Sequence, residues 1–249
     1  MKLRNGYILH HDVEAHVVVI ATGITEPSEN AKTGPMIQIF ILRDDMSPVD
    51  AIKTGADESI CFDCPHRGDK AAGRKRSCYV NVGQSPRAVY AAFARGSYSF
   101  LSIDDYALVF TGREVRLGAY GDPYCIPELI VARIYSLASR HTGYSHQWRR
   151  ADWLRKYVMA SCDTRADFIE AQHHGWRTFR VANSLEAQPL EILCPASEEA
   201  GHKTQCFKCG LCEIDLHPGS RFGQIERVRD SSISSTARLR ASSQPMRKP

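Results

Sequence analysis

The sequence predicts an α/β fold with a mainly parallel sheet, and two observations support this. Short runs of β-branched and aliphatic residues alternate along the chain with amphipathic stretches, and helix-capping residues stand at the ends of those stretches. Alternating strands and helices imply right-handed crossovers, which place the strands parallel and cover the sheet with helices. We expect either an open sheet or a full or partial β/α barrel, and the barrel is preferred.

The first predicted strands are residues 16–21 (HVVVIA) and 36–42 (MIQIFIL), which are rich in β-branched residues and bounded by turn formers. A polar connection, residues 26–34, joins them. From residue 57 to residue 81 the hydrophobic period is lost, and Cys, Gly, Lys and Arg become frequent. This segment is predicted to be a loop that something other than a hydrophobic core holds in place.

Helix signals stand on both sides of the next strand. Ser85 suits an N-cap and Gly96 a helix end, so a helix is expected between them. Residues 115–120 then alternate between two faces, as a strand does. Pro127 opens an amphipathic stretch, which is expected to form a helix that closes at the cationic residues 140–141, before Gly143.

The alternation continues toward the C-terminus. Residues 144–148 and 158–162 are predicted strands. Thr164 suits the N-cap of a helix that Gly175 ends, and residues 178–182 return as a strand.

These patterns divide the chain into three parts. Residues 1–190 form the α/β domain, which contains the cysteine loop 57–81. Residues 191–228 form a cysteine-rich, metal-binding segment. Residues 229–249 have too little apolar content to order themselves and are expected to be a disordered tail.

Composition limits the class of protein. The hydrophobic share of 43% and the charged share of 24% are those of ordinary globular proteins. No apolar run approaches the roughly eighteen residues that span a bilayer, and the N-terminus lacks the apolar core of an export signal. We therefore expect a cytoplasmic protein with no membrane partner. The sequence does not indicate an oligomeric state.

Nine cysteines without an export signal favour metal binding over disulfides. Four of them, the quartet Cys194, Cys206, Cys209 and Cys212, lie close together near the C-terminus. Two residues between thiols let both sulfurs of a Cys-x-x-Cys turn face one ion, and the distant Cys194 completes four ligands. Four thiolates suit zinc or an iron–sulfur cluster equally well, so the spacing leaves both possible.

Three other cysteines, the trio Cys61, Cys64 and Cys78, form the N-terminal group. Three thiolates leave a position open, which a catalytic cluster needs for a substrate or cosubstrate. His66 is an alternative fourth ligand, and the trio and the quartet are alternatively parts of one site.

Cations separate Cys64 from Cys78 in the sequence. They are Lys70, Arg74, Lys75 and Arg76. They can screen an anionic cluster or bind phosphate, as nucleic acid would require, or they can simply form a solvated loop.

Polar residues follow the predicted strands at the edge where ligands bind in parallel sheets. The catalytic candidates there are Asp122, His146 and Asp163. Asp122 can bind a hydroxyl group, an amine or a metal-bound water, or can merely cap a turn. His146 can act as an acid or base, or can be structural. The cofactor-binding candidates are Gly121, Gln147 and Asn183.

Several segments resemble a family of uncharacterised proteins from bacteriophages and mobile elements. They are residues 30–55, 61–83 (CFDCPHRG through SCYVNVG), 115–123 (VRLGAYGDP), 143–148 (GYSHQW), 175–181 and 194–212. More distantly, the order of cysteine loop, helix, strand ending in Asp-Pro and β/α units is similar to phage-encoded proteins related to radical S-adenosylmethionine enzymes.

That second resemblance implies a [4Fe–4S] cluster held by Cys61, Cys64 and Cys78, with S-adenosylmethionine bound at the rim of the sheet. The spacing departs from the family pattern. The usual loop has three and then two residues between its cysteines, whereas this chain has two and then thirteen.

Two functions follow. The first is a radical-type iron–sulfur enzyme, with the quartet as a structural or auxiliary site. The alternative is a zinc-bearing nucleic-acid-binding or replication accessory protein, in which the basic loop and the tail contact phosphates. No Gly-x-x-x-x-Gly-Lys-Ser/Thr run follows a predicted strand, so nucleotide hydrolysis through a phosphate-binding loop is not expected.

Overall fold

The structure is a computed structural model that describes residues 2–182, 189 and 191–213, together with the backbone of residues 223–227. The strands are β1 (Gly6–Asp12), β2 (Val17–Thr22), β3 (Ile37–Arg43), β4 (Ser99–Phe100), β5 (Glu114–Tyr120), β6 (Arg140–Ser145), β7 (Met159–Cys162), β8 (Thr178–Ala182), β9 (Glu191–Leu193) and β10 (Gly223–Arg227). The helices are α1 (Pro48–Thr54), α2 (Glu58–Cys61), α3 (Ser85–Ala94), α4 (Tyr106–Phe110), α5 (Glu128–Leu137), α6 (Arg165–His173) and α7 (Cys206–Cys209). Short 3-10 turns are η1 (Pro65–Arg67), η2 (Ile103–Asp105), η3 (Pro123–Cys125), η4 (His146–Arg149) and η5 (Asp152–Lys156).

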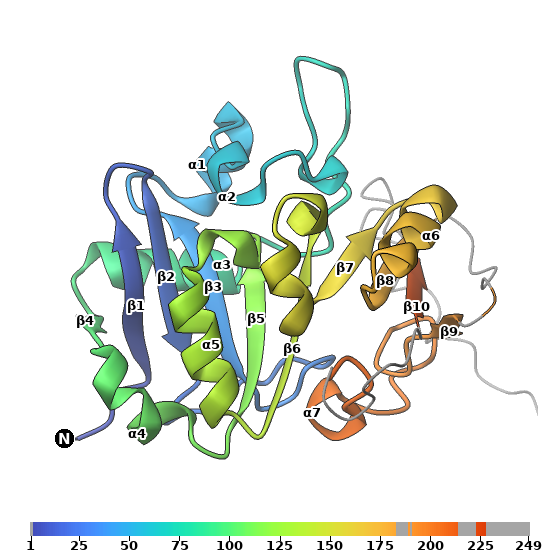
Figure 1. The fold of residues 1–249 in the computed structure, drawn as a ribbon. Coiled ribbons are helices and arrows are strands. Elements are labelled where there is room, and N and C mark those ends of the chain that lie inside the picture. Colours follow the sequence, from blue (N-terminus) through green and yellow to red (C-terminus); the bar gives the residue numbers. More distant parts are fainter. Residues whose placement is uncertain (1, 183–188, 190, 214–222, 228–249) are drawn as a thin grey trace, which may run out of the picture.

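All ten strands belong to one sheet, in the order β4-β1-β2-β3-β5-β6-β7-β8-β10-β9 (Figure 1). The pairs β1–β2 and β2–β3 are antiparallel, and the other pairs are parallel. The prediction of an α/β fold with a mainly parallel sheet is confirmed.

The prediction of a full β/α barrel is wrong, because the sheet formed by the described strands is open, with β4 and β9 at its edges. A barrel requires its first and last parallel strands to pair. Here the antiparallel strand β2 pairs with β3 on the side away from β5, and so occupies the edge at which a closing strand would have to bind.

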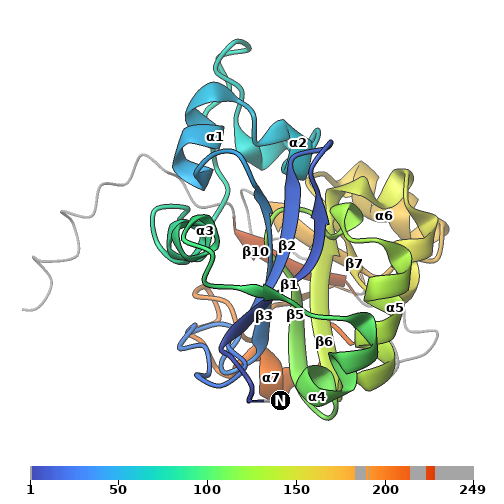
Figure 2. The same cartoon turned by 90° about the vertical axis from the view of Figure 1, so that its left-hand side faces the viewer.

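Helices cover both faces of the sheet. Figure 2 shows α5 and α6 on one side and α3 on the other. The apolar stripe of α5, with Ile130, Val131 and Ile134, is buried in the main core. Within the described residues, no helix combines the length and apolar character that crossing a bilayer requires.

Several predicted elements are confirmed with small changes at their ends. The strand at 178–182 is β8, and the helix after Thr164 is α6, where Thr164 and Asp167 form a capping box. The helix that starts after Pro127 ends at Leu137, earlier than predicted.

The strand predicted at 144–148 lies closer to the N-terminus in the structure. It is β6, which covers Arg140–Ser145, and residues 146–149 form η4. The prediction took Gly143 as the residue after a helix end. Gly143 instead lies inside β6, where an added Cβ would be 2.8 Å from Val158 Cγ1 and 3.0 Å from Leu117 Cβ. Close packing therefore explains this glycine, as is common for glycines inside strands.

Residues 191–228, predicted to form a separate cysteine-rich segment, contribute β9 and β10 to the common sheet. The predicted disordered tail, residues 229–249, lies outside the described residues.

Candidate metal centre

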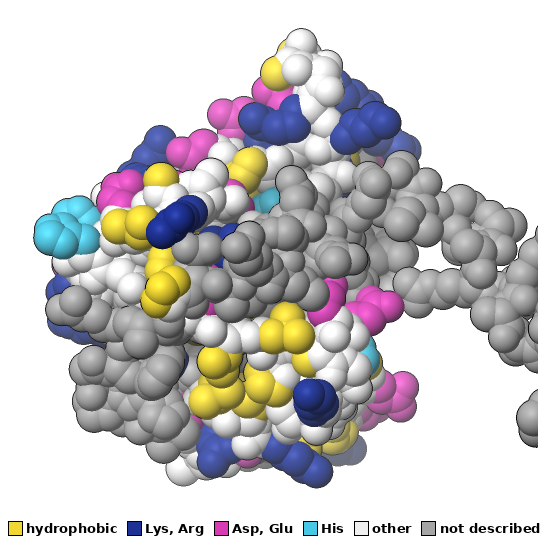
Figure 3. Space-filling model, turned by 90° about the vertical axis from the view of Figure 1, so that its right-hand side faces the viewer, with side chains coloured by type: hydrophobic (Ala, Val, Ile, Leu, Met, Phe, Trp, Pro, Cys, Tyr) yellow, Lys and Arg dark blue, Asp and Glu magenta, His cyan; other side chains and the backbone are white. Residues whose placement is uncertain are grey.

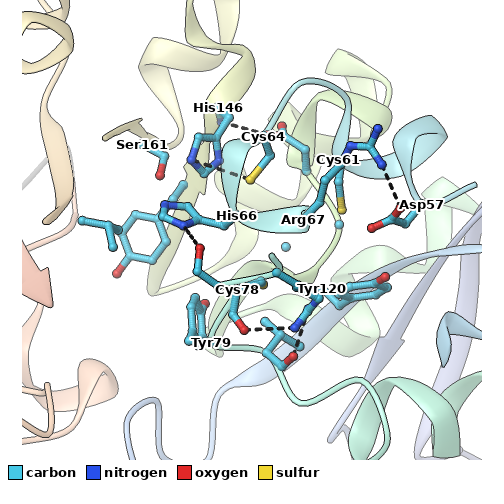
Figure 4. A pocket seen from close by; sticks show the side chains of 18 of the residues that line it. Asp57, Cys61, Cys64, His66, Arg67, Cys78, Tyr79, Tyr120, His146 and Ser161 are labelled. Carbon is cyan, nitrogen blue, oxygen red and sulfur yellow. Dashed lines mark hydrogen bonds and ion pairs between the residues drawn. The ribbon is translucent and has the colours of Figure 1, made fainter. Parts of the chain in front are cut away.

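A cavity of about 130 Å³ lies at the carboxyl ends of β5, β6, β7 and β8 (Figure 4). This is the edge at which parallel sheets bind ligands. The three cysteines of the trio all line it. The strands contribute Gly118, Tyr120, Tyr144, Ser161 and Phe179 to its lining.

The long insertion between Cys64 and Cys78 does not keep these thiols apart. The carbonyl of His66 accepts hydrogen bonds from the amides of Ser77 (3.1 Å) and Cys78 (2.9 Å). Farther out, the amide and carbonyl groups of Asp69 and Arg74 exchange hydrogen bonds of 2.8 and 2.7 Å. The intervening residues therefore project from the sheet as a closed finger, residues 66–78, and Cys78 returns to the cavity.

The trio thiols influence one another electrostatically. Burial raises the pKa of the Cys61 thiol well above its ordinary value, and nearby Cys64 and Cys78 raise it further. Burial also raises the pKa of Cys78, while the guanidinium group of Arg76 opposes the rise. A metal bound near these thiols would stabilise thiolates that otherwise stay protonated.

Two histidines and a carboxylate lie beside the trio. His66 Nε2 is 2.7 Å from Asp163 Oδ1, and His146 Nε2 is 3.4 Å from the same oxygen. His146 Nε2 is also 3.8 Å from Cys64 Sγ, and Figure 4 shows these two side chains pointing toward each other. Burial alone would raise the pKa of Asp163, but hydrogen bonds from His146 and His66 hold it far below its ordinary value.

Asp122 lines the cavity, but both of its carboxylate oxygens are already engaged. One accepts from the Tyr124 amide (2.9 Å) and the Ser145 hydroxyl (2.7 Å), and the other accepts from the His146 amide (2.8 Å). Asp122 thus caps η3 and fixes the backbone of His146. These contacts support the capping alternative, and its catalytic role stays a prediction.

Gly121 lies at a turn with φ of 80°, where an added Cβ would be 2.6 Å from Ile41 Cβ. Gly112 has a similar φ of 69° but no neighbour within 4 Å. We expect Gly121→Ala to lower the free energy of unfolding by about 1–3 kcal/mol more than Gly112→Ala, because only the first change overpacks its surroundings. Urea unfolding of both variants measures this, and equal losses would contradict the steric explanation.

Gln147, another cofactor-binding candidate, does not line the cavity with the others. Gln147 is buried, and its side-chain amide donates a 2.6 Å hydrogen bond to Asp63 Oδ1. Asn183 lies outside the described residues. Of the six catalytic and cofactor candidates, the structure therefore brings together Gly121, Asp122, His146 and Asp163 near the trio.

The quartet lines a different cavity, of about 10 Å³. This volume is roughly what one water molecule needs. Arg140 donates to the carbonyls of Phe207 and Lys208, and Arg177 donates to those of Leu211 and Glu213. Burial raises the pKa of Cys206 to about 12, with nearby Cys212 contributing. The two arginines therefore hold the segment that carries Cys206, Cys209 and Cys212 against the sheet.

The two cysteine groups line separate cavities. The cavity of the quartet includes Met36 and Arg140, at the start of β3 and β6, whereas the trio lies at the opposite ends of the strands. Tyr144 lies between them, because it lines the trio cavity while its hydroxyl is 3.6 Å from Cys212 Sγ.

Neither cysteine group has the spacing of thiols bound to a single ion. All nine cysteines are described and none forms a disulfide, but no three thiol sulfurs lie within 4.8 Å of one another. Tetrahedral zinc, with Zn–S bonds of about 2.3 Å, sets its sulfurs about 3.8 Å apart. Binding one ion would therefore require the side chains to rotate inward.

Sequence reasoning missed other residues of the cavity. The ammonium group of Lys32 lies 5.1 Å from the centre of the Phe179 ring and 5.7 Å from that of Tyr79. Lys32 belongs to a polar loop far from the trio in sequence, and no local pattern marks it. The sequence shows that Tyr79 follows Cys78, but it does not indicate that Lys32 and the ring of Phe179 lie nearby.

Comparison of the chain with protein-family models, with curated proteins and with solved structures gave no match.

Proposed function

We propose that the protein is an iron–sulfur enzyme of the radical S-adenosylmethionine type, with its cluster held by Cys61, Cys64 and Cys78. The observation that carries this proposal is that three thiols from one loop line a roomy cavity at the carboxyl edge of a mainly parallel sheet. Ligands of such sheets bind at this edge.

The residues that line the trio cavity suit an iron–sulfur cluster. The trio cavity, of about 130 Å³, offers room for several atoms beyond the thiols. In a cluster the thiolates bind different irons, so sulfur atoms farther apart than in a zinc site suit it. When bound, the cluster would supply one-electron chemistry. Three protein thiols would leave one iron position for a cosubstrate.

The rest of the cavity suits an organic molecule. Tyr120, Tyr144 and Phe179 provide apolar lining, and Arg76 and Lys32 bring cations to it. Organic ligands bind in cavities with mainly apolar walls and a few polar groups. When no ion is bound to them, His146 and Asp163 can hold a proton at the edge of the site, because His146 contacts both Asp163 and Cys64.

The test is anaerobic purification followed by iron, sulfide and absorption measurements. We expect brown wild-type protein with broad visible absorption, and colourless Cys61→Ser protein that has lost most of its iron and sulfide. Cys125→Ser is the matched control, because the Cys125 thiol contacts the backbone carbonyls of Ser59 and Ile60 and does not line the trio cavity. Iron-free wild-type protein, or iron retained in Cys61→Ser, would contradict the proposal.

The second candidate function is a zinc-bearing nucleic-acid-binding protein. It is favoured by the finger, whose exposed cations Lys70, Arg74 and Lys75 border a broad cavity of about 930 Å³. Figure 3 shows Lys and Arg side chains on both flanks of the projecting segment at the top of the molecule. Fluorescence anisotropy with labelled DNA and RNA at several salt concentrations tests it, since phosphate contacts make affinity fall steeply with salt.

A further inference from the structure

A cluster of two imidazoles and one carboxylate lies beside the trio and contains no thiol. We propose that His66, His146 and Asp163 bind one divalent first-row metal ion, such as Mn²⁺ or Fe²⁺. Two imidazoles and one carboxylate form the ligand set of non-haem iron sites and of many catalytic zinc sites. Such a set leaves further coordination positions open.

The ligand atoms are already close enough to share an ion. One nitrogen of each histidine and an oxygen of Asp163 all lie within 4.8 Å of one another. The separations from the carboxylate are 2.7 Å for His66 Nε2 and 3.4 Å for His146 Nε2. Metal–nitrogen bonds of about 2.0–2.1 Å place neighbouring ligand atoms roughly 3 Å apart, so small movements would suffice.

The surroundings hold both histidines in position. The Nδ1 atom of His66 is 2.8 Å from the Ser77 hydroxyl, which directs Nε2 toward Asp163. The backbone of His146 is fixed by its amide hydrogen bond to Asp122. A partner on the second ring nitrogen, as Ser77 is for His66, is typical of metal-binding histidines, because it sets the tautomer and orientation of the ring.

A plain ion pair does not account for this arrangement. One histidine suffices to pair with Asp163, yet two imidazoles present Nε2 to the same carboxylate. The three side chains are only 14–24% exposed, so they are largely withdrawn from water. Both histidines line the trio cavity, so the open positions of a bound ion would face a molecule held there. A carbonyl, carboxylate or phosphate oxygen of that molecule can complete the coordination.

The structure also provides a matched control. His16, Asp44 and Asp45 are the other group of described residues whose ligand atoms lie within 4.8 Å of one another. Asp45 is already held by Arg43 through hydrogen bonds of 2.8 and 2.7 Å. This group is therefore less suited to a cation.

The experiment is a titration of the full chain, as purified, with Mn²⁺. Binding is measured by the loss of the electron paramagnetic resonance signal of the free ion. Mn²⁺ is the probe because it prefers imidazole and carboxylate ligands to thiolates. We expect one Mn²⁺ per wild-type chain, and at least tenfold weaker binding in His66→Ala and Asp163→Asn. His16→Ala and Cys61→Ser should bind as the wild type does.

Three results would overturn the proposal: no Mn²⁺ binding by wild-type chain, loss of binding in His16→Ala, or full binding in both His66→Ala and Asp163→Asn. Asp163→Asn keeps the shape of the side chain, so this variant tests ligation even if His66→Ala fails to fold. Cys61→Ser separates this proposal from the cluster, because it should lose iron–sulfur absorption and still bind Mn²⁺.

Discussion

Cys209→Ser should release one zinc ion per chain and lower the thermal unfolding midpoint sharply. We propose that the quartet binds zinc, because its cavity of about 10 Å³ has room for one ion and no cluster. Structural zinc contributes roughly 10 kcal/mol or more to the folding of small modules at neutral pH. The segment around α7 has little apolar core of its own, so its stability should depend on the metal.

Cys209 is the most informative thiol to replace, because it is only partly buried and serine fits its place. A loss of stability would then report the metal and not packing. The measurements are zinc content by mass spectrometry and thermal unfolding by circular dichroism, with Cys125→Ser as the control. Zinc-free wild-type protein, or a Cys209→Ser protein that keeps its zinc, would refute the assignment.

Glu191→Leu should lower the free energy of unfolding by about 3–5 kcal/mol, because it leaves the buried guanidinium of Arg180 without its carboxylate. The side chain of Glu191 is 0% exposed and that of Arg180 is 8% exposed. The guanidinium group donates two parallel hydrogen bonds, of 2.7 and 2.8 Å, to the carboxylate. The pair joins β8 to β9, although β10 lies between these two strands in the sheet. Its loss should therefore loosen the whole edge of the sheet.

The double variant Arg180→Met/Glu191→Leu distinguishes the charge effect from packing. Replacing a buried ion pair by apolar residues of similar volume is often neutral, so the double variant should regain most of the lost stability. Urea unfolding of the single and double variants gives the coupling between the two positions. A double variant as unstable as Glu191→Leu would argue that side-chain volume, and not the removal of the carboxylate beside Arg180, causes the loss of stability.

Local signals predicted most of the elements. β8 has the bounds predicted from the alternation of helices and strands and from Gly175, which ends the preceding helix. α6 begins at the capping box of Thr164. Closure of the sheet was not predictable in this way, because it depends on which distant strand pairs with β3. β6 was misplaced because a glycine that packs closely inside a strand looks the same in sequence as one that ends a helix.

The candidate site was partly predictable for a similar reason. Asp122, His146 and Asp163 follow successive strands, and parallel pairing brings those ends together. Their individual roles were not visible, because they depend on hydrogen bonds between elements, such as that of the Asp122 carboxylate with the His146 amide. Lys32 reaches the cavity from a separate loop, which no local pattern indicates.

The closed finger between Cys64 and Cys78 has a consequence for how such proteins are detected. Since the His66 carbonyl fixes the base of the finger, residues can be added or removed at its tip, around Gly73, without moving either thiol. We therefore expect the fold to tolerate different lengths of this interval. A motif search with fixed gaps would overlook homologues whose thiols meet in the same way, and a search that allows a variable insertion after the second cysteine would find them.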